Sequence, residues 1–104
     1  MAYEARYVFK LNAGADLKAA MSAMQHGAAL WRKHGAGGPR LWAITAGELG
    51  NYVLAVQFDD AAAFAKVVDT LSADADFQAW QARNAKDGHI AWVRSNHARE
   101  VALA

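Results

Sequence analysis

The four histidines are the residues of this sequence best suited to bind a metal ion or transfer a proton. They form two pairs along the chain, His26 with His34 and His89 with His97. On a strand, at about 3.3 Å per residue, His89 and His97 would lie roughly 26 Å apart. On a helix, at about 1.5 Å per residue, His26 and His34 would lie roughly 12 Å apart. One metal ion cannot bridge either pair, because ligand bonds are about 2 Å long. No HExxH pattern is present either, so we expect no metal site and no cofactor.

Nucleophilic and phosphate-binding chemistry find no support either. The chain has no cysteine, which excludes disulfides, thiolate nucleophiles and iron–sulfur clusters. Ser22, Ser72 and Ser95 lie in helix-surface, cap and strand contexts, and no GxSxG pattern occurs. The glycine-rich run at 35–38 follows an expected helix and precedes an expected strand, whereas a phosphate loop needs the reverse order.

Aromatic side chains are the remaining chemical feature, with four tryptophans and three tyrosines. They either fill the core and a subunit interface or line an apolar cleft for an aromatic or polyketide-like molecule. Arg94 alternates with Ile90 and Trp92, which predicts that it lies on the more apolar face of the last strand. There Arg94, or Arg6, would contact a carboxylate or enolate oxygen of the ligand. The candidate binding residues are therefore Arg6, Tyr7, Trp31, Trp42, Trp80, Trp92 and Arg94.

The first half of the chain predicts a strand, a helix and a hairpin. Residues 2–11 alternate in polarity, as in a strand. Asp16 caps a helix that ends at Gly35 and leaves Leu30 on its solvent side. Its expected buried stripe is Leu17, Met21, Met24, Ala28 and Trp31. Residues 40–46 and 52–58 form a hairpin around the turn "GELGN".

The second half predicts helix, interruption, short helix and strand. Asp59 or Asp60 caps a helix from about residue 60. The run "SADAD" interrupts it, and Ser72 or Asp74 caps a further segment that carries Phe77 and Trp80. Residues 86–88 close that segment, and residues 89–97 form the last strand.

The resulting β-α-β-β-α-β order predicts an α+β, ferredoxin-like fold with an antiparallel sheet and the helices on one face, as a single domain over residues 1–104. The other face would be too apolar for water. It would hold Val8, Val53, Ala55, Ala91 and Val93 beside Arg6 and Gln57. We therefore expect a homodimer that packs sheet against sheet.

Several stretches together resemble the dimeric α+β barrel superfamily, in particular NIPSNAP-like and related small stand-alone proteins. They are "RLW" at 40–42, "GELGNYVLAVQFDD" at 47–60 and "AAFAKVVDTLSADADFQAW" at 62–80. The resemblance implies a homodimeric barrel with ligand space between sheet and helices or inside the barrel. The superfamily includes antibiotic-biosynthesis monooxygenases, haem-degrading enzymes and muconolactone-type isomerases, so the fold alone selects no reaction.

Two enzyme branches of that superfamily differ from this chain at their functional positions. Haem-degrading members carry an iron-binding histidine where this chain has Gln81. They also use an asparagine on the first strand, whereas the nearest asparagine here, Asn12, lies in the turn after that strand. Antibiotic-type oxygenases commonly carry a histidine in the second helix, and residues 60–87 contain none. Both departures favour a binding protein over an oxygenase.

The net charge and the hydropathy of the chain restrict its possible partners and its expected location. The net charge of +1 argues against nucleic acid or an anionic membrane as an obligatory ligand. No apolar run is long enough for a membrane span or a signal peptide, and we expect a cytoplasmic protein. We expect it to bind a small hydrophobic or aromatic molecule. The alternative is a cofactor-independent monooxygenase or isomerase for an aromatic, polyketide-like or lactone substrate.

Overall fold

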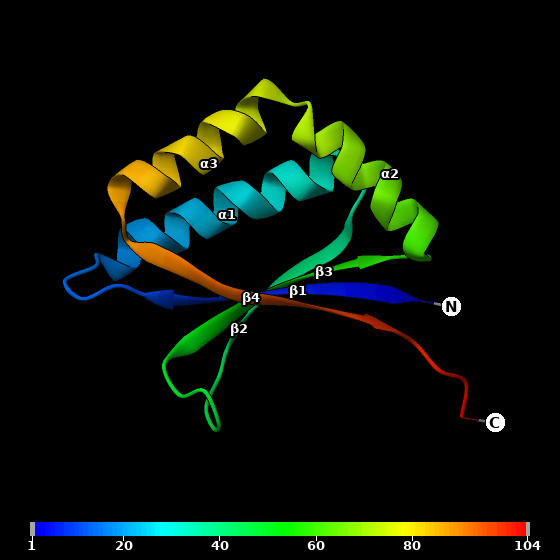
Figure 1. Ribbon diagram of the computed structural model, residues 1–104, viewed down its shortest axis with the longest axis horizontal. Coiled ribbons are helices and arrows are strands. Elements are labelled where there is room, and N and C mark those ends of the chain that lie inside the picture. Colours follow the sequence, from blue (N-terminus) through cyan, green and yellow to red (C-terminus); the bar gives the residue numbers. More distant parts are fainter. Residues whose placement is uncertain (1, 104) are drawn as a thin grey trace.

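The computed structural model describes residues 2–103 and shows one sheet with helices on one of its faces (Figure 1). The expected order of elements is confirmed, and "SADAD" divides the second helical region into two helices. In chain order the elements are β1 (Tyr3–Leu11), α1 (Leu17–Lys33), β2 (Gly37–Ala43), β3 (Asn51–Phe58), α2 (Ala61–Ser72), α3 (Ala75–Asp87) and β4 (Ile90–Arg99). None of the helices in this described part has the length and apolar character to span a membrane.

An aspartate caps each of the three helices. The sequence predicts an aspartate cap for α1 and α2, and it offers Asp74 as one of two possible caps for α3. Asp16, Asp60 and Asp74 each accept a hydrogen bond from a backbone N–H of the first turn, at 3.2, 2.7 and 2.8 Å. These bonds satisfy donors that a helix N-terminus otherwise leaves unpaired. Gly88 ends α3 with φ 66°, a left-handed conformation that glycine adopts at little cost.

The sheet is antiparallel with the strand order β2-β3-β1-β4, which confirms the ferredoxin-like α+β fold. Tyr7 pairs with Leu54, and Phe9 pairs with Tyr52, so the odd-numbered residues of β1 face the helices. The core lies on that face. It includes Ala5, Phe9, Met24, Leu30, Trp31, Leu54, Val56, Leu71, Phe77 and Trp80. We call the opposite side, with Glu4, Arg6, Val8 and Lys10 of β1, the open face.

A β-bulge interrupts the pairing of β1 with β4. Phe9 pairs with Trp92, and the preceding residue, Val8, pairs with Arg94, so Val93 is an extra residue in β4. Trp92 therefore faces the helices, whereas Arg94 lies on the open face opposite Val8. The expectation that Arg94 shares the face of Trp92 is wrong, because it assumed regular alternation through this position.

Two further expectations are corrected by packing. Leu30 is buried, with 5% of its surface exposed, whereas Leu17 is 50% exposed. The reason is that α1 contacts both the sheet and α3, so its buried stripe is shifted relative to one that faces a sheet alone. The strand β2 begins at Gly37 rather than at residue 40, because an irregularity between Gly37 and Arg40 accommodates Pro39.

Asp74 joins the C-terminus of α1 to the N-terminus of α3. His34 Nε2 donates to its carboxylate at 2.6 Å and Lys33 Nζ at 3.0 Å. The hydrogen bond from His34, followed by the one from Lys33, holds the pKa of Asp74 well below its usual range. This cluster fixes α3, whose inner side forms a wall of the pocket described below.

Removing the charge of Asp74 should destabilise the fold at neutral pH. Asn can still cap the helix, so Asp74→Asn isolates the charge, and we expect its Tm to be lower at pH 7 by roughly 4–8 °C. The pKa of Asp74 is lower in the folded protein than in the unfolded chain, where it is about 4. Below about pH 5 the unfolded chain therefore binds more protons than the folded protein, and the folded state of the wild type loses stability. The Tm gap should therefore narrow between pH 7 and pH 3, as followed by circular dichroism.

Asp76→Asn is the matched control for this experiment. The Asp76 side chain is 73% exposed and lies 3.8 Å from Lys33, so its loss should change Tm by less than about 2 °C. A Tm gap for Asp74→Asn that is as large at pH 3 as at pH 7 would contradict the charge interpretation.

Candidate functional site

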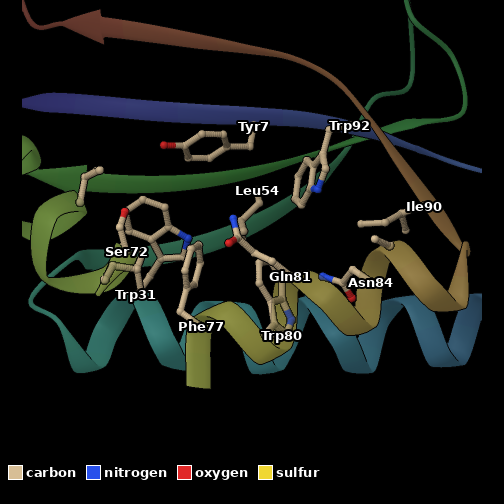
Figure 2. A pocket seen from close by; sticks show the side chains of 13 residues that line it. Tyr7, Trp31, Leu54, Ser72, Phe77, Trp80, Gln81, Asn84, Ile90 and Trp92 are labelled. Atoms are coloured by element: carbon tan, nitrogen blue, oxygen red, sulfur yellow. The ribbon is translucent and has the colours of Figure 1, made fainter. Parts of the chain in front are cut away.

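A partly open pocket of about 500 Å³ lies between the sheet and the helices α2 and α3. Figure 2 shows its side chains converging from the strands above and the helices below. All three helices and three of the four strands contribute to its wall. The lining residues are Tyr7, Trp31, Leu54, Val68, Leu71, Ser72, Phe77, Trp80, Gln81, Asn84, Ala85, Ile90 and Trp92.

Five aromatic residues line the pocket. The ring of Tyr7 lies 5.7 Å from that of Trp31 and 6.4 Å from that of Trp92, measured between centroids. Trp80 stacks on Phe77 at 5.6 Å and lies 6.5 Å from Trp92. Such rings give a flat apolar ligand large contact surfaces at low entropic cost, because each has only two side-chain torsions.

Trp80 is held in place by α1. Its indole Nε1 donates to the backbone oxygen of Ala23 at 2.8 Å, and its ring lies directly over Gly27. A Cβ atom at Gly27 would be only 2.5 Å from Cζ2 of Trp80. The absence of a side chain at Gly27 therefore lets α1 and α3 approach closely and fixes the pocket wall between them.

The polar groups of the pocket are neutral. Burial raises the pKa of Tyr7 to about 12, so its phenol stays protonated at physiological pH. Ser72, Gln81 and Asn84 add a hydroxyl and two carboxamides. Of the side chains in residues 2–103 that line the pocket, none is an Asp, Glu, Lys, Arg or His.

Asn84 carries a buried donor without a partner. Its amide Nδ2 is inaccessible to solvent, and no acceptor among the described residues bonds to it. Figure 2 shows Asn84 and Gln81 projecting from α3 on the pocket side. An unpaired buried amide destabilises the protein, and only a rotation of the Asn84 carboxamide would bring this donor to the pocket that the residue lines.

The structure divides the candidate binding residues between the two faces of the sheet. Four of them, Tyr7, Trp31, Trp80 and Trp92, meet in the pocket. The other three, Arg6, Trp42 and Arg94, lie on the open face, where Arg6 pairs with Glu4 and Arg94 with Glu48. Neither arginine reaches the pocket, so the expected contact with a carboxylate or enolate has no cation here.

Some side chains at or near the site were not anticipated. Gln81 and Asn84 follow Phe77 and Trp80 at i, i+3, i+4 and i+7, so the helical spacing places all four on one face. That spacing is a signal which could have identified the two carboxamides as lining residues.

His97 is brought to the helix-facing side by the bulge. Its Nδ1 lies 2.9 Å from the hydroxyl of Tyr3, and its ring lies 4.9 Å from Phe64 and 6.1 Å from Tyr7. No local sequence pattern indicates this position, because it depends on the extra residue upstream.

Comparison with known proteins establishes the fold. No model of a known family matches this sequence, and no curated protein matches it. Among solved structures, a NIPSNAP domain protein from Burkholderia xenovorans has a TM-score of 0.74 at 22% identity, covering 100% of this chain and 98% of that one. A NIPSNAP family protein from Agrobacterium tumefaciens has a TM-score of 0.67 at 20% identity, covering 94% and 84%.

A third solved structure carries an assigned activity. SnoaB, a cofactor-independent oxygenase from Streptomyces nogalater, has a TM-score of 0.65 at 15% identity, covering 99% of this chain and 94% of that one. These identities show a shared fold. The NIPSNAP-like, ferredoxin-like resemblance expected from the sequence is confirmed at that level.

Proposed function

We propose that this small NIPSNAP-like α+β protein is a homodimer that binds a small hydrophobic or aromatic molecule between its sheet and helices. The observation that carries the proposal is the convergence of Tyr7, Trp31, Trp80 and Trp92 on one pocket. Its volume of about 500 Å³ falls within the range of small-molecule sites, and its wall is mostly apolar with a few placed polar groups. Both properties support a ligand with fused rings.

Binding can be tested with three-ring probes that differ in polarity. We expect fluorene or 9-fluorenone at a hundredfold excess over its dissociation constant to stabilise the wild type by about 2.7 kcal/mol, measured as a rise in Tm. Trp92→Ala should weaken binding about tenfold, because Trp92 forms one wall of the pocket. Trp92 is 47% exposed and adds little to the core, so its loss should affect the fold little.

Trp42→Ala provides a matched control, since Trp42 has a similar exposure of 54% but lies on the open face. Because Trp42 also lies in the proposed dimer interface, the Tm of this variant without ligand is its reference, and the rise in Tm that a probe causes should equal that of the wild type. If neither probe shifts the Tm of the wild type, the proposed binding function is wrong.

The homodimer is supported by the shape and surface of one chain. The subunit is only 17 Å thick along its shortest axis. Its accessible surface of 6563 Å² exceeds the roughly 5,700 Å² expected for a folded chain of this mass. Trp42 and Val93, 54% and 45% exposed, add apolar area outside the helix-covered core. Packing two open faces together would bury this area and form a barrel.

The alternative, a cofactor-independent monooxygenase or isomerase for an aromatic, polyketide-like or lactone substrate, has one specific support. The Tyr7 hydroxyl lines the pocket in protonated form and can donate to a developing enolate oxygen. Arg6 and Arg94, the other groups expected to stabilise such a charge, lie on the open face. Binding is therefore favoured over catalysis, and dioxygen uptake with a polyketide-like anthrone is the measurement that separates them.

A further inference from the structure

We infer that the pocket selects neutral aromatic ketones over the matching hydrocarbons and carboxylates, and that Asn84 is the residue that recognises the ketone oxygen. This inference rests on the proposed binding function and adds a ligand class and a specificity-determining residue to it. It follows from the charge of the lining and from one unpaired donor.

The described lining offers no positive charge to an anionic ligand, which disfavours aromatic carboxylates. Within residues 2–103 the pocket wall consists of apolar, aromatic, hydroxyl and carboxamide side chains without a cation. Arg94, which the sequence places close to Trp92, pairs with Glu48 on the open face instead. A carboxylate that entered the pocket would lose hydration and find no opposite charge, which is strongly unfavourable.

The unpaired donor distinguishes a ketone from a hydrocarbon. Asn84 Nδ2 is buried without an acceptor, so the free protein already lacks this hydrogen bond. Asn84 lines the pocket, so rotation of its carboxamide would turn Nδ2 toward a bound ring. A carbonyl oxygen on that ring would then supply the missing acceptor, whereas a hydrocarbon would leave the hydrogen bond unmade. The protonated phenol of Tyr7 is a second neutral donor on the opposite wall. Gln81 is exposed and already solvated, so it contributes less to the discrimination.

The experiment compares three ligands of one ring system: fluorene, 9-fluorenone and 9-fluorenone-2-carboxylate. We expect the wild type to bind 9-fluorenone about tenfold more tightly than either of the other two, as measured by quenching of tryptophan fluorescence. Asn84→Leu should bind fluorene as the wild type does and lose the preference for 9-fluorenone. Its Tm without ligand should be equal to or above that of the wild type, because the substitution removes an unpaired buried donor.

Two other variants complete the design. Asn84→Asp keeps the size of the side chain but replaces the donor by an acceptor, so it should bind 9-fluorenone no better than fluorene. Gln25→Leu removes a carboxamide from the exposed surface of α1 and should leave all three affinities unchanged.

The outcomes separate this inference from the binding function. If no ligand binds the wild type, the binding function itself fails, and the inference fails with it. If fluorene or the carboxylate binds as tightly as 9-fluorenone, the pocket remains and the ketone selectivity is refuted. If the preference persists in both Asn84→Leu and Asn84→Asp, the assignment to Asn84 is refuted.

Discussion

Gly27→Ala is expected to lower the free energy of unfolding by about 1–2 kcal/mol, even though alanine is the better helix former. Alanine in a helix interior normally stabilises by roughly 0.5–1 kcal/mol relative to glycine. Here its Cβ would lie 2.5 Å from Cζ2 of Trp80, whose indole is also held by the hydrogen bond to Ala23. The ring would have to move and strain or break that bond, and overpacking of this kind typically costs about 1–3 kcal/mol. Urea unfolding followed by circular dichroism measures the difference.

In a Trp80→Leu background, the effect of Gly27→Ala on the free energy of unfolding should have the opposite sign. In Trp80→Leu the indole atoms that a Cβ would meet are removed, so Gly27→Ala should stabilise that variant by roughly 0.5–1 kcal/mol. The same substitution would thus be unfavourable with Trp80 present and favourable without it. A destabilisation of equal size in both backgrounds would rule out the contact with Trp80 as its cause.

Trp42→Glu is expected to dissociate the proposed homodimer. In a twofold interface each residue occurs twice, so the substitution removes two tryptophans and buries two carboxylates without partners. Buried tryptophans at interface centres commonly contribute about 2 kcal/mol or more each, so the dissociation constant should rise roughly a thousandfold. At micromolar concentration, sedimentation should show twice the subunit mass of 11.2 kDa for the wild type and the subunit mass for the variant.

Leu17→Glu is the matched control for the dimer, because it places the same carboxylate at an apolar residue that is 50% exposed at the start of α1. This position is remote from the open face, so the dimer should persist. A wild type that sediments as a monomer at micromolar concentration would refute the proposed assembly.

Local patterns were sufficient to predict the elements and most of the pocket. Period-two alternation identifies β1, and the aspartate caps mark where the helices begin, because these signals depend only on neighbouring residues. Tyr7 and Trp31 then meet because each lies on the core side of its own element. Trp80 and Trp92 join them for the same reason.

Features that depend on tertiary context were not predictable in the same way. Leu30 is buried because α1 packs against two partners, and the sequence of α1 does not show where α3 will lie. The positions of Arg94 and His97 depend on the extra residue Val93, and β-bulges in edge strands have no reliable sequence signal. An alternation pattern read straight through Val93 therefore assigns every later side chain of β4 to the wrong face.

The bulge at Val93 also decides whether the wall of the pocket carries a positive charge. With regular alternation Arg94 would stand opposite Tyr7, and its positive charge would attract anionic ligands to the aromatic rings. The extra residue puts Ser95 opposite Tyr7 instead and places the guanidinium on the far side of the sheet. If the pocket binds a ligand as proposed, the ligand charge that it accepts depends on strand register rather than on composition. Two chains with the same residues in β4, paired one position apart, would favour ligands of different charge.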